Sequence, residues 1–136
     1  MFKTIKYILS LILVFSFSFA QDWESDYASE PFANEFQANI TAQLFIDGVE
    51  QTTGMVAAFG EDGYISALDS DGAIFFPLNE VNIYELAVWS NNAGELMTFK
   101  YMNDQGVVID LNETYEFVIG DVLGDAFAPF QLTGSS

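Results

Sequence analysis

Two aspartates spaced two residues apart form the most metal-like motif in this 136-residue sequence. They stand in the turn Asp69-Ser70-Asp71-Gly72. Carboxylates at this spacing on a tight loop can share a Ca²⁺ ion, because hard cations prefer oxygen ligands. The fifth and twelfth positions of a loop starting at Asp69 are Ala73 and Glu80, so the match to an EF-hand loop is partial. The motif leaves open a Ca²⁺ site at Asp69 and Asp71 and an ordinary surface β-turn. Acids that would join such a site if their loops meet are Glu61, Asp62, Asp121 and Asp125.

Large aromatic side chains are the second kind of candidate binding residue. Trp23 and Trp89, together with Tyr64 and Tyr101, could stack against sugar rings if they were exposed on one face of a sheet. Aromatic residues at alternate positions of a strand more often pack in the core. The sequence therefore leaves open a ligand-binding role for Trp23 and Trp89 and a structural one.

The residue types that usually perform catalysis are missing. The chain contains no His and no Cys, and none of its serines stands in a G-x-S-x-G motif. Among 20 Asp and Glu residues, some pair always has the separation of about 5 to 10 Å that glycosidase carboxylates need, so acid pairs carry no signal. We therefore expect no enzymatic activity and no catalytic residues.

The N-terminus has the order of segments found in a cleavable secretory signal. Lysines precede an apolar run over residues 7–19, and the small residues Ser18 and Ala20 occupy positions −3 and −1 of a cut before Gln21. The apolar run is shorter than the roughly 20 residues that span a bilayer, and no later segment is long and apolar enough. The sequence predicts a signal peptide at 1–20, no membrane span, and a mature protein that is secreted or held at the cell surface.

The net negative charge of the mature chain limits the kinds of partner that it can bind. Its only basic side chain is Lys100, against 20 Asp and Glu residues. Nucleic acid and anionic membrane surfaces would repel such a protein, so both are excluded as partners. The charge favours cations, basic partners or salty surroundings, and it also serves plain solubility. Because no Cys can form a disulfide, a packed core must supply the stability.

Turn signals that combine Asn or Asp with Gly recur at short intervals after residue 37. The segments between them alternate in polarity, as in residues 40–46, where Ile, Ala, Leu and Ile share one face. Residues 81–90 and 95–102 flank residues 91–94, which predicts a hairpin with a four-residue loop. No segment has a convincing helical stripe. The predicted strands are 38–47, 55–59, 64–68, 73–76, 81–90, 95–102, 106–110, 114–119 and 127–132.

These patterns predict an all-β protein, an antiparallel β-sandwich of Ig-like or jelly-roll-like type with eight or nine short strands. The sandwich domain is expected at 38–136. Residues 21–37 are acidic and aromatic without a clean period. We expect them to form an N-terminal extension that packs a few aromatic side chains onto the domain.

Several stretches resemble a small β-sandwich module of secreted, adhesin-like proteins, mainly from Bacteroidetes-type bacteria and often exported by the type IX system. The resemblance covers roughly residues 38 to 132, and it implies a fold and an address without catalytic residues. Two features depart from it: Gly-Glu-Asp-Gly stands at 60–63, where such modules usually carry a Cys and an Arg, and we expect a stand-alone copy. The matching stretches are 40–50, 55–59, 88–101, 111–117 and 128–132.

Two functions remain open at this point. The first is a secreted, non-catalytic interaction or adhesion module that presents loops and an acidic surface to an extracellular protein. The alternative is a carbohydrate-binding module that uses exposed aromatic residues, with help from Ca²⁺. Exposed coplanar aromatic rings would favour sugar, whereas a dry sheet edge or an apolar patch would favour protein. The sequence does not decide the oligomeric state.

Overall fold

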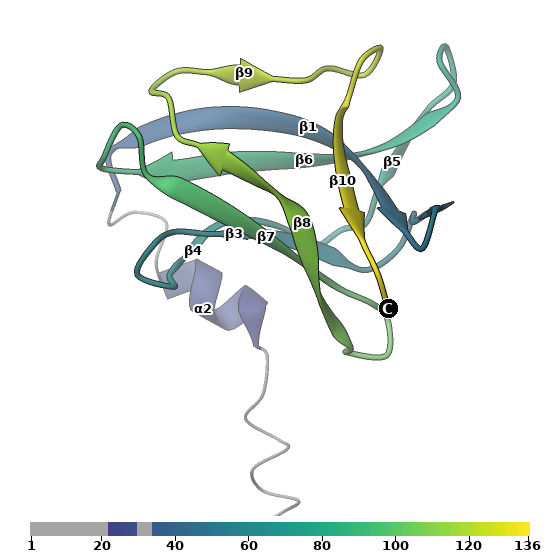
Figure 1. Cartoon of the computed structure of the whole chain (residues 1–136), viewed down its shortest axis with the longest axis horizontal. Coiled ribbons are helices and arrows are strands. Elements are labelled where there is room, and N and C mark those ends of the chain that lie inside the picture. The colour runs from purple at the N-terminus through teal and green to yellow at the C-terminus, as the bar shows by residue number, and fades with distance from the viewer. Residues whose placement is uncertain (1–21, 30–33) are drawn as a thin grey trace, which may run out of the picture.

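A computed structural model describes residues 22–29 and 34–136, so the predicted signal peptide at 1–20 lies outside the described residues. The described part is mostly β, as predicted, with one short helix and ten strands in one strongly curled mixed sheet, a half-barrel (Figure 1). The elements are α2 (Trp23–Ser29), β1 (Phe36–Ile46), β2 (Val49–Glu50), β3 (Met55–Phe59), β4 (Ile65–Asp69), β5 (Ile74–Phe76), β6 (Val81–Ser90), β7 (Leu96–Met102), β8 (Val108–Glu116), β9 (Val122–Leu123) and β10 (Phe130–Gly134).

The sheet is continuous, which replaces the predicted two-layered antiparallel sandwich. Its strand order is β4-β3-β7-β8-β10-β1-β6-β5, and β2 and β9 also pair with β1. The long strand β1 pairs with β6 on one side and, running parallel, with β9 and then β10 on the other. Because β1 has hydrogen-bonded neighbours on both sides, it joins the two halves of the sheet into one continuous layer.

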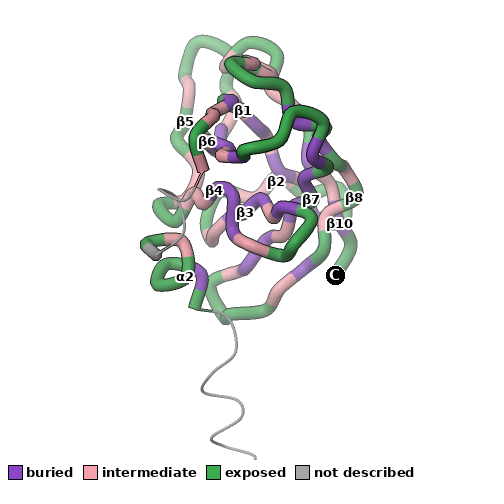
Figure 2. The backbone as a smooth tube through the Cα atoms, turned by 90° about the vertical axis from the view of Figure 1, so that its left-hand side faces the viewer, coloured by how far each residue is buried: buried purple, intermediate pink, exposed green. Residues whose placement is uncertain are grey.

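Alternation along the strands builds one core inside the curl. In β1 the buried face is the predicted one, and its residues pack with inward-facing residues of β6 and β7. Figure 2 shows the buried residues in the middle of the strands and the exposed residues mainly in the loops. Removing each such side chain from water stabilises the fold by about 1.5–3 kcal/mol. These residues are Ile40, Leu44, Tyr84, Leu86, Val88, Met97, Phe99 and Tyr101.

The predicted hairpin between residues 81–90 and 95–102 is wrong. β6 pairs with β1 and β5, whereas β7 pairs with β3 and β8. The loop at 91–95 therefore carries the chain between two distant parts of the sheet. The two strands predicted at 106–110 and 114–119 form one strand, β8.

The helix α2 lies in the segment 21–37, which was predicted to be an acidic aromatic extension of the domain. The Asp22 carboxylate accepts a hydrogen bond from the Ser25 backbone N–H (3.1 Å), as an N-cap does. Trp23 packs edge-on against Phe59, with 5.7 Å between ring centroids, so the helix is anchored to β3 by one large side chain. No helix within residues 22–29 and 34–136 is long and apolar enough to cross a membrane.

The edge strand β4 is fastened to β6 by side chains, and we call these contacts the side-chain seam. The buried Ser66 hydroxyl donates to the Trp89 carbonyl (2.8 Å) and accepts from the Trp89 backbone N–H (3.0 Å). At the other end of β4, the Asp69 carboxylate accepts from the Glu85 backbone N–H (2.9 Å). Side chains thus satisfy backbone groups of β6 that a neighbouring strand would otherwise pair.

Candidate functional site

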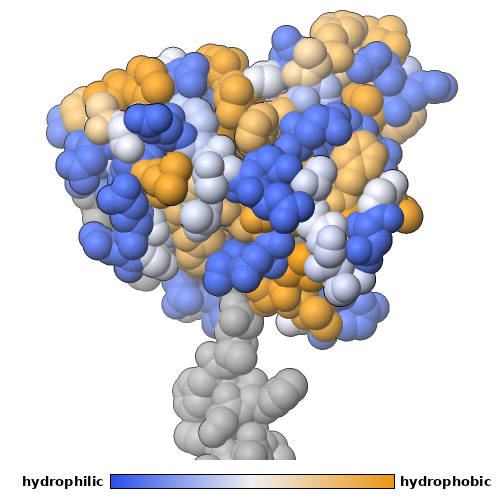
Figure 3. Space-filling model, viewed as in Figure 1, coloured by the Kyte–Doolittle hydropathy of each residue, from blue (hydrophilic) through white to orange (hydrophobic). Residues whose placement is uncertain are grey.

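An apolar knob projects from one corner of the half-barrel, and it consists of Ile74, Phe75, Leu78 and Phe127. These side chains are between 54% and 80% exposed. They come from the β5–β6 hairpin and from the loop at 124–129, which rise together at the upper right of Figure 1. Figure 3 shows apolar atoms gathered at this projecting corner. Large apolar side chains that cluster in the open commonly mark an interaction site.

The two segments of the knob are locked together. Phe127 stacks edge-on against Phe76, with 5.2 Å between ring centroids. The Asn79 side-chain amide donates to the Phe127 carbonyl (3.1 Å). The Asp125 carboxylate accepts from the backbone N–H groups of Phe127 (2.8 Å) and Ala128 (2.7 Å). The exposed rings therefore sit on a pre-formed surface, which lowers the entropy lost when a partner binds.

Gly124 sets the close approach of this loop to β1. Its φ is +73°, and a Cβ placed on it would lie 2.5 Å from the Thr41 carbonyl oxygen and 2.6 Å from the Phe130 nitrogen. Both neighbours are backbone atoms that cannot give way. Only glycine fits here, so the position of the loop that carries Phe127 depends on it.

A small acidic hollow of about 200 Å³ adjoins the knob. Ile74 lines it on the side of the knob, and Asp69, Asp71 and Glu85 supply carboxylates. The side chains of Asp71 and Glu85 are exposed. The hollow can accept a positively charged group whose apolar stem rests on Ile74.

Asp69 connects the end of β4 to the following turn and to β6 through two hydrogen bonds. One of its oxygens accepts from the Asp71 backbone N–H (3.1 Å) and the other from the Glu85 backbone N–H (2.9 Å). Burial raises the pKa of Asp69, and the nearby charge of Asp71 adds to this rise, which outweighs the lowering by the two hydrogen bonds. Among the described residues no three acids are arranged to hold a metal ion. The Ca²⁺ site at Asp69 and Asp71 thus remains a prediction without support from this geometry.

The raised pKa of Asp69 predicts a specific pH dependence. The folded protein binds this proton more readily than the unfolded chain, so the contribution of Asp69 to stability rises as the pH falls through the raised pKa toward the ordinary 3.8. Urea denaturation of the wild type and Asp69→Asn should show the wild type gaining stability relative to the variant as the pH falls from neutral toward 3.8. A relative loss over this range would contradict the assignment.

The predicted aromatic binding residues Trp23 and Trp89 do not form a common surface. Trp23 is only 3% exposed and belongs to the contact between α2 and β3. Trp89 is half-buried on β6, and its backbone takes part in the side-chain seam. The exposed aromatic rings of the knob are instead Phe75 and Phe127, which were not among the residues predicted to bind a ligand. The sequence signal for the knob was the unbroken apolar run at 73–78. A short edge strand cannot bury both of its faces, so some of these apolar side chains must be exposed.

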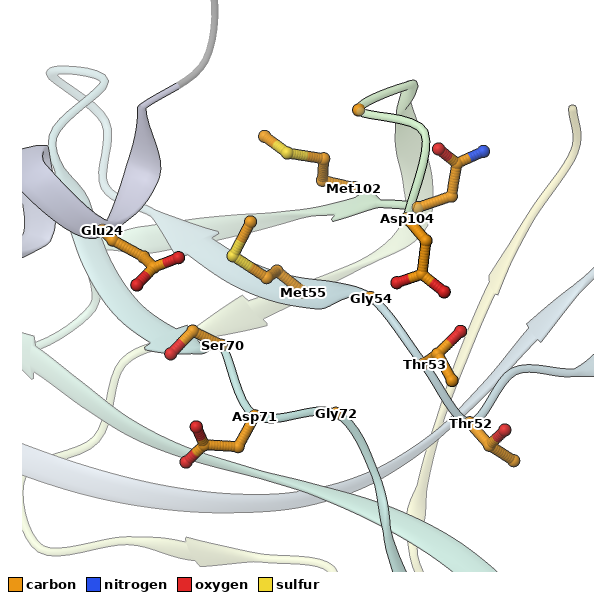
Figure 4. A pocket seen from close by; sticks show the side chains of 12 residues that line it. Glu24, Thr52, Thr53, Gly54, Met55, Ser70, Asp71, Gly72, Met102 and Asp104 are labelled. Atoms are coloured by element: carbon orange, nitrogen blue, oxygen red, sulfur yellow. The ribbon is translucent and has the colours of Figure 1, made fainter.

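A second, open pocket of about 420 Å³ lies between α2 and the turns that follow β2, β4 and β7. In Figure 4 the side chain of Met55 lies between those of Glu24 and Asp104, and Met102 and Asp71 also line the pocket. Asp71 lines both this pocket and the acidic hollow. Carboxylates therefore continue from the knob toward α2.

We compared the chain with known protein families, curated proteins and solved structures. No match was found in any of these comparisons.

Proposed function

We propose that this protein is a secreted, non-catalytic interaction module that docks an extracellular or cell-surface protein through the apolar knob. The observation that carries the proposal is the group of four exposed apolar side chains on the β5–β6 hairpin and the loop at 124–129, two segments that a hydrogen bond from Asn79 joins. Export rests on the signal sequence expected at 1–20. An adhesive role agrees with the resemblance to adhesin-like modules.

A protein partner fits the chemistry of the knob better than a sugar does. The knob offers no polar side-chain group that could bind sugar hydroxyls, since it consists of Ile74, Phe75, Leu78 and Phe127. Of the two tryptophans that a sugar platform would have used, Trp23 is buried and Trp89 is half-buried. Apolar anchors that insert into a partner's pocket are typical of protein–protein hot spots. We therefore keep carbohydrate binding only as an outcome of the test below.

The test measures binding of the fluorescently labelled protein to intact cells of the organism that produces it. The double variant Leu78→Ser/Phe127→Ser removes the two most exposed residues of the knob. It is expected to weaken binding at least about tenfold, since hot-spot residues contribute on the order of 2 kcal/mol each. Protease treatment of the cells should abolish binding, whereas periodate oxidation of their glycans should not.

The matched control is Val107→Ser/Ile119→Ser, which removes two side chains of 53% and 49% exposure from turns outside the knob. It should leave binding within about twofold of the wild type. Equal losses in both double variants, or wild-type binding by the knob variant, would reject the knob as the docking surface. Loss after periodate alone would favour the carbohydrate-binding alternative.

A further inference from the structure

We infer that the partner is a cationic protein segment that places apolar side chains on the knob and a Lys or Arg side chain in the adjoining acidic hollow. This inference rests on the proposed function, and it names the chemistry of the partner. The observation behind it is the shared position of Ile74, which belongs to the knob and also lines the hollow between Asp71 and Glu85. An apolar group and a positive charge on one segment can therefore engage both at once.

The described part of the chain supplies no counterion to the hollow. Within residues 22–29 and 34–136, Lys100 is the one basic side chain. Its ammonium lies 3.7 Å from Asp110 and 5.3 Å from the centroid of the Phe59 ring, on strands far along the sheet from β6. A positive charge that neutralises Asp71 and Glu85 must therefore come from outside the residues that the structure describes.

The shape of the hollow suits a long basic side chain. Its volume of about 200 Å³ has room for an ammonium or guanidinium group and part of its stem. The methylene groups would lie along Ile74, while the charged head reaches the exposed carboxylates. Asp69 also lines the hollow. Both of its oxygens accept backbone N–H groups, so its carboxylate is already held in place.

The acidic surface extends beyond the hollow in one direction. Asp71 also lines the pocket of Figure 4, where Glu24 and Asp104 follow. A segment with several basic residues would meet carboxylates along this path. Electrostatic attraction of this kind raises the association rate and falls with added salt.

The same charge argues against a second copy of this chain as the occupant. A copy would bring acids to acids, because Lys100 is the single basic residue of the described part and lies away from the knob. Sedimentation velocity at physiological salt is therefore expected to show a monomer. A concentration-dependent dimer that Leu78→Ser/Phe127→Ser dissolves would overturn the assignment of the partner.

The decisive experiment repeats the cell-binding assay with Asp71→Asn/Glu85→Gln. Because both lost carboxylates would face the partner's cation in a desolvated contact, binding should weaken at least about tenfold. The control Asp62→Asn/Glu116→Gln also removes two negative charges, but from exposed sites at the opposite end of the strands. Its binding should stay within about threefold of the wild type. Raised salt should weaken the wild type more than the hollow variant.

Chemical blocking of the cells identifies the partner's cation. Acetylation of amines should abolish binding if the cation is Lys, and phenylglyoxal should do so if it is Arg. If neither treatment lowers binding, or if the hollow variant equals its control, the cationic partner is rejected. The proposed function still stands in that case, provided that Leu78→Ser/Phe127→Ser loses binding. The proposed function and the cationic partner are both rejected if Leu78→Ser/Phe127→Ser also binds like the wild type.

Discussion

Replacing Glu95 by alanine is expected to lower the free energy of unfolding by about 3 kcal/mol. Glu95 is only 8% exposed and has no cationic partner within residues 22–29 and 34–136. Its carboxylate instead accepts hydrogen bonds from the hydroxyls of Tyr64 (2.9 Å) and Ser90 and from the Glu61 backbone N–H (2.9 Å). The change removes the acceptor that these three donors share. The Tyr64 hydroxyl can still donate to the Trp89 carbonyl (3.1 Å) and the Ser90 hydroxyl to the Asn92 carbonyl (3.3 Å), whereas the Glu61 N–H loses its acceptor, and an unmet donor costs about 1–3 kcal/mol.

The position of Glu95 explains why the loss should be large. Its side chain joins the turn at 60–64 to the end of β6 and to the start of β7. The Glu61 carboxylate completes the contact by accepting from the Leu96 backbone N–H (3.1 Å). Burial raises the pKa of Tyr64 to about 12, so its hydroxyl remains a donor at physiological pH. This network replaces the hairpin that would otherwise have held β6 and β7 together.

Urea denaturation of Glu95→Ala, Glu95→Gln and the exposed control Glu116→Ala measures the effect. An amide keeps one acceptor oxygen but turns an NH₂ group toward one of the donors. Glu95→Gln should therefore lose less stability than Glu95→Ala, and Glu116→Ala should stay within about 0.5 kcal/mol of the wild type. If Glu95→Ala were as stable as Glu116→Ala, the hydrogen-bond network would not hold these segments.

Replacing Ser66 by alanine should destabilise the protein by about 2 kcal/mol. The Ser66 hydroxyl is fully buried and is both donor and acceptor to the Trp89 backbone. Without it the Trp89 N–H faces a methyl group and has no acceptor. The Trp89 carbonyl keeps one acceptor contact, because the Tyr64 hydroxyl also donates to it (3.1 Å). The larger part of the cost therefore falls on the N–H.

Thermal unfolding compares Ser66→Ala with Ser70→Ala, an exposed serine just beyond the end of β4. For a domain of this size the loss at Ser66 corresponds to a melting temperature lower by roughly 10 °C, and Ser70→Ala should shift it by no more than about 2 °C. Amide hydrogen exchange at Trp89 should accelerate in Ser66→Ala alone. Unchanged protection at Trp89 would mean that the side-chain seam does not close β4 onto β6.

Local patterns in the sequence determined most of the strands. Residues 55–59 and 81–90 are β3 and β6 as predicted, and β1 buries the predicted face. Period-two alternation reports which side of a strand meets the core, and Asx–Gly turns mark where it ends. Neither signal depends on which strands become neighbours, so both could be read without the fold.

The tertiary structure alone decided the pairing of strands and the surfaces that follow from it. Alternation is the same whether β6 pairs with β7 or with β1, and the choice depends on contacts between residues far apart in the sequence, such as Ser66 with Trp89. The curl of one sheet in place of a sandwich has the same origin. The knob likewise exists because Phe127 reaches Phe76 across about fifty residues of chain, a contact that no local pattern encodes.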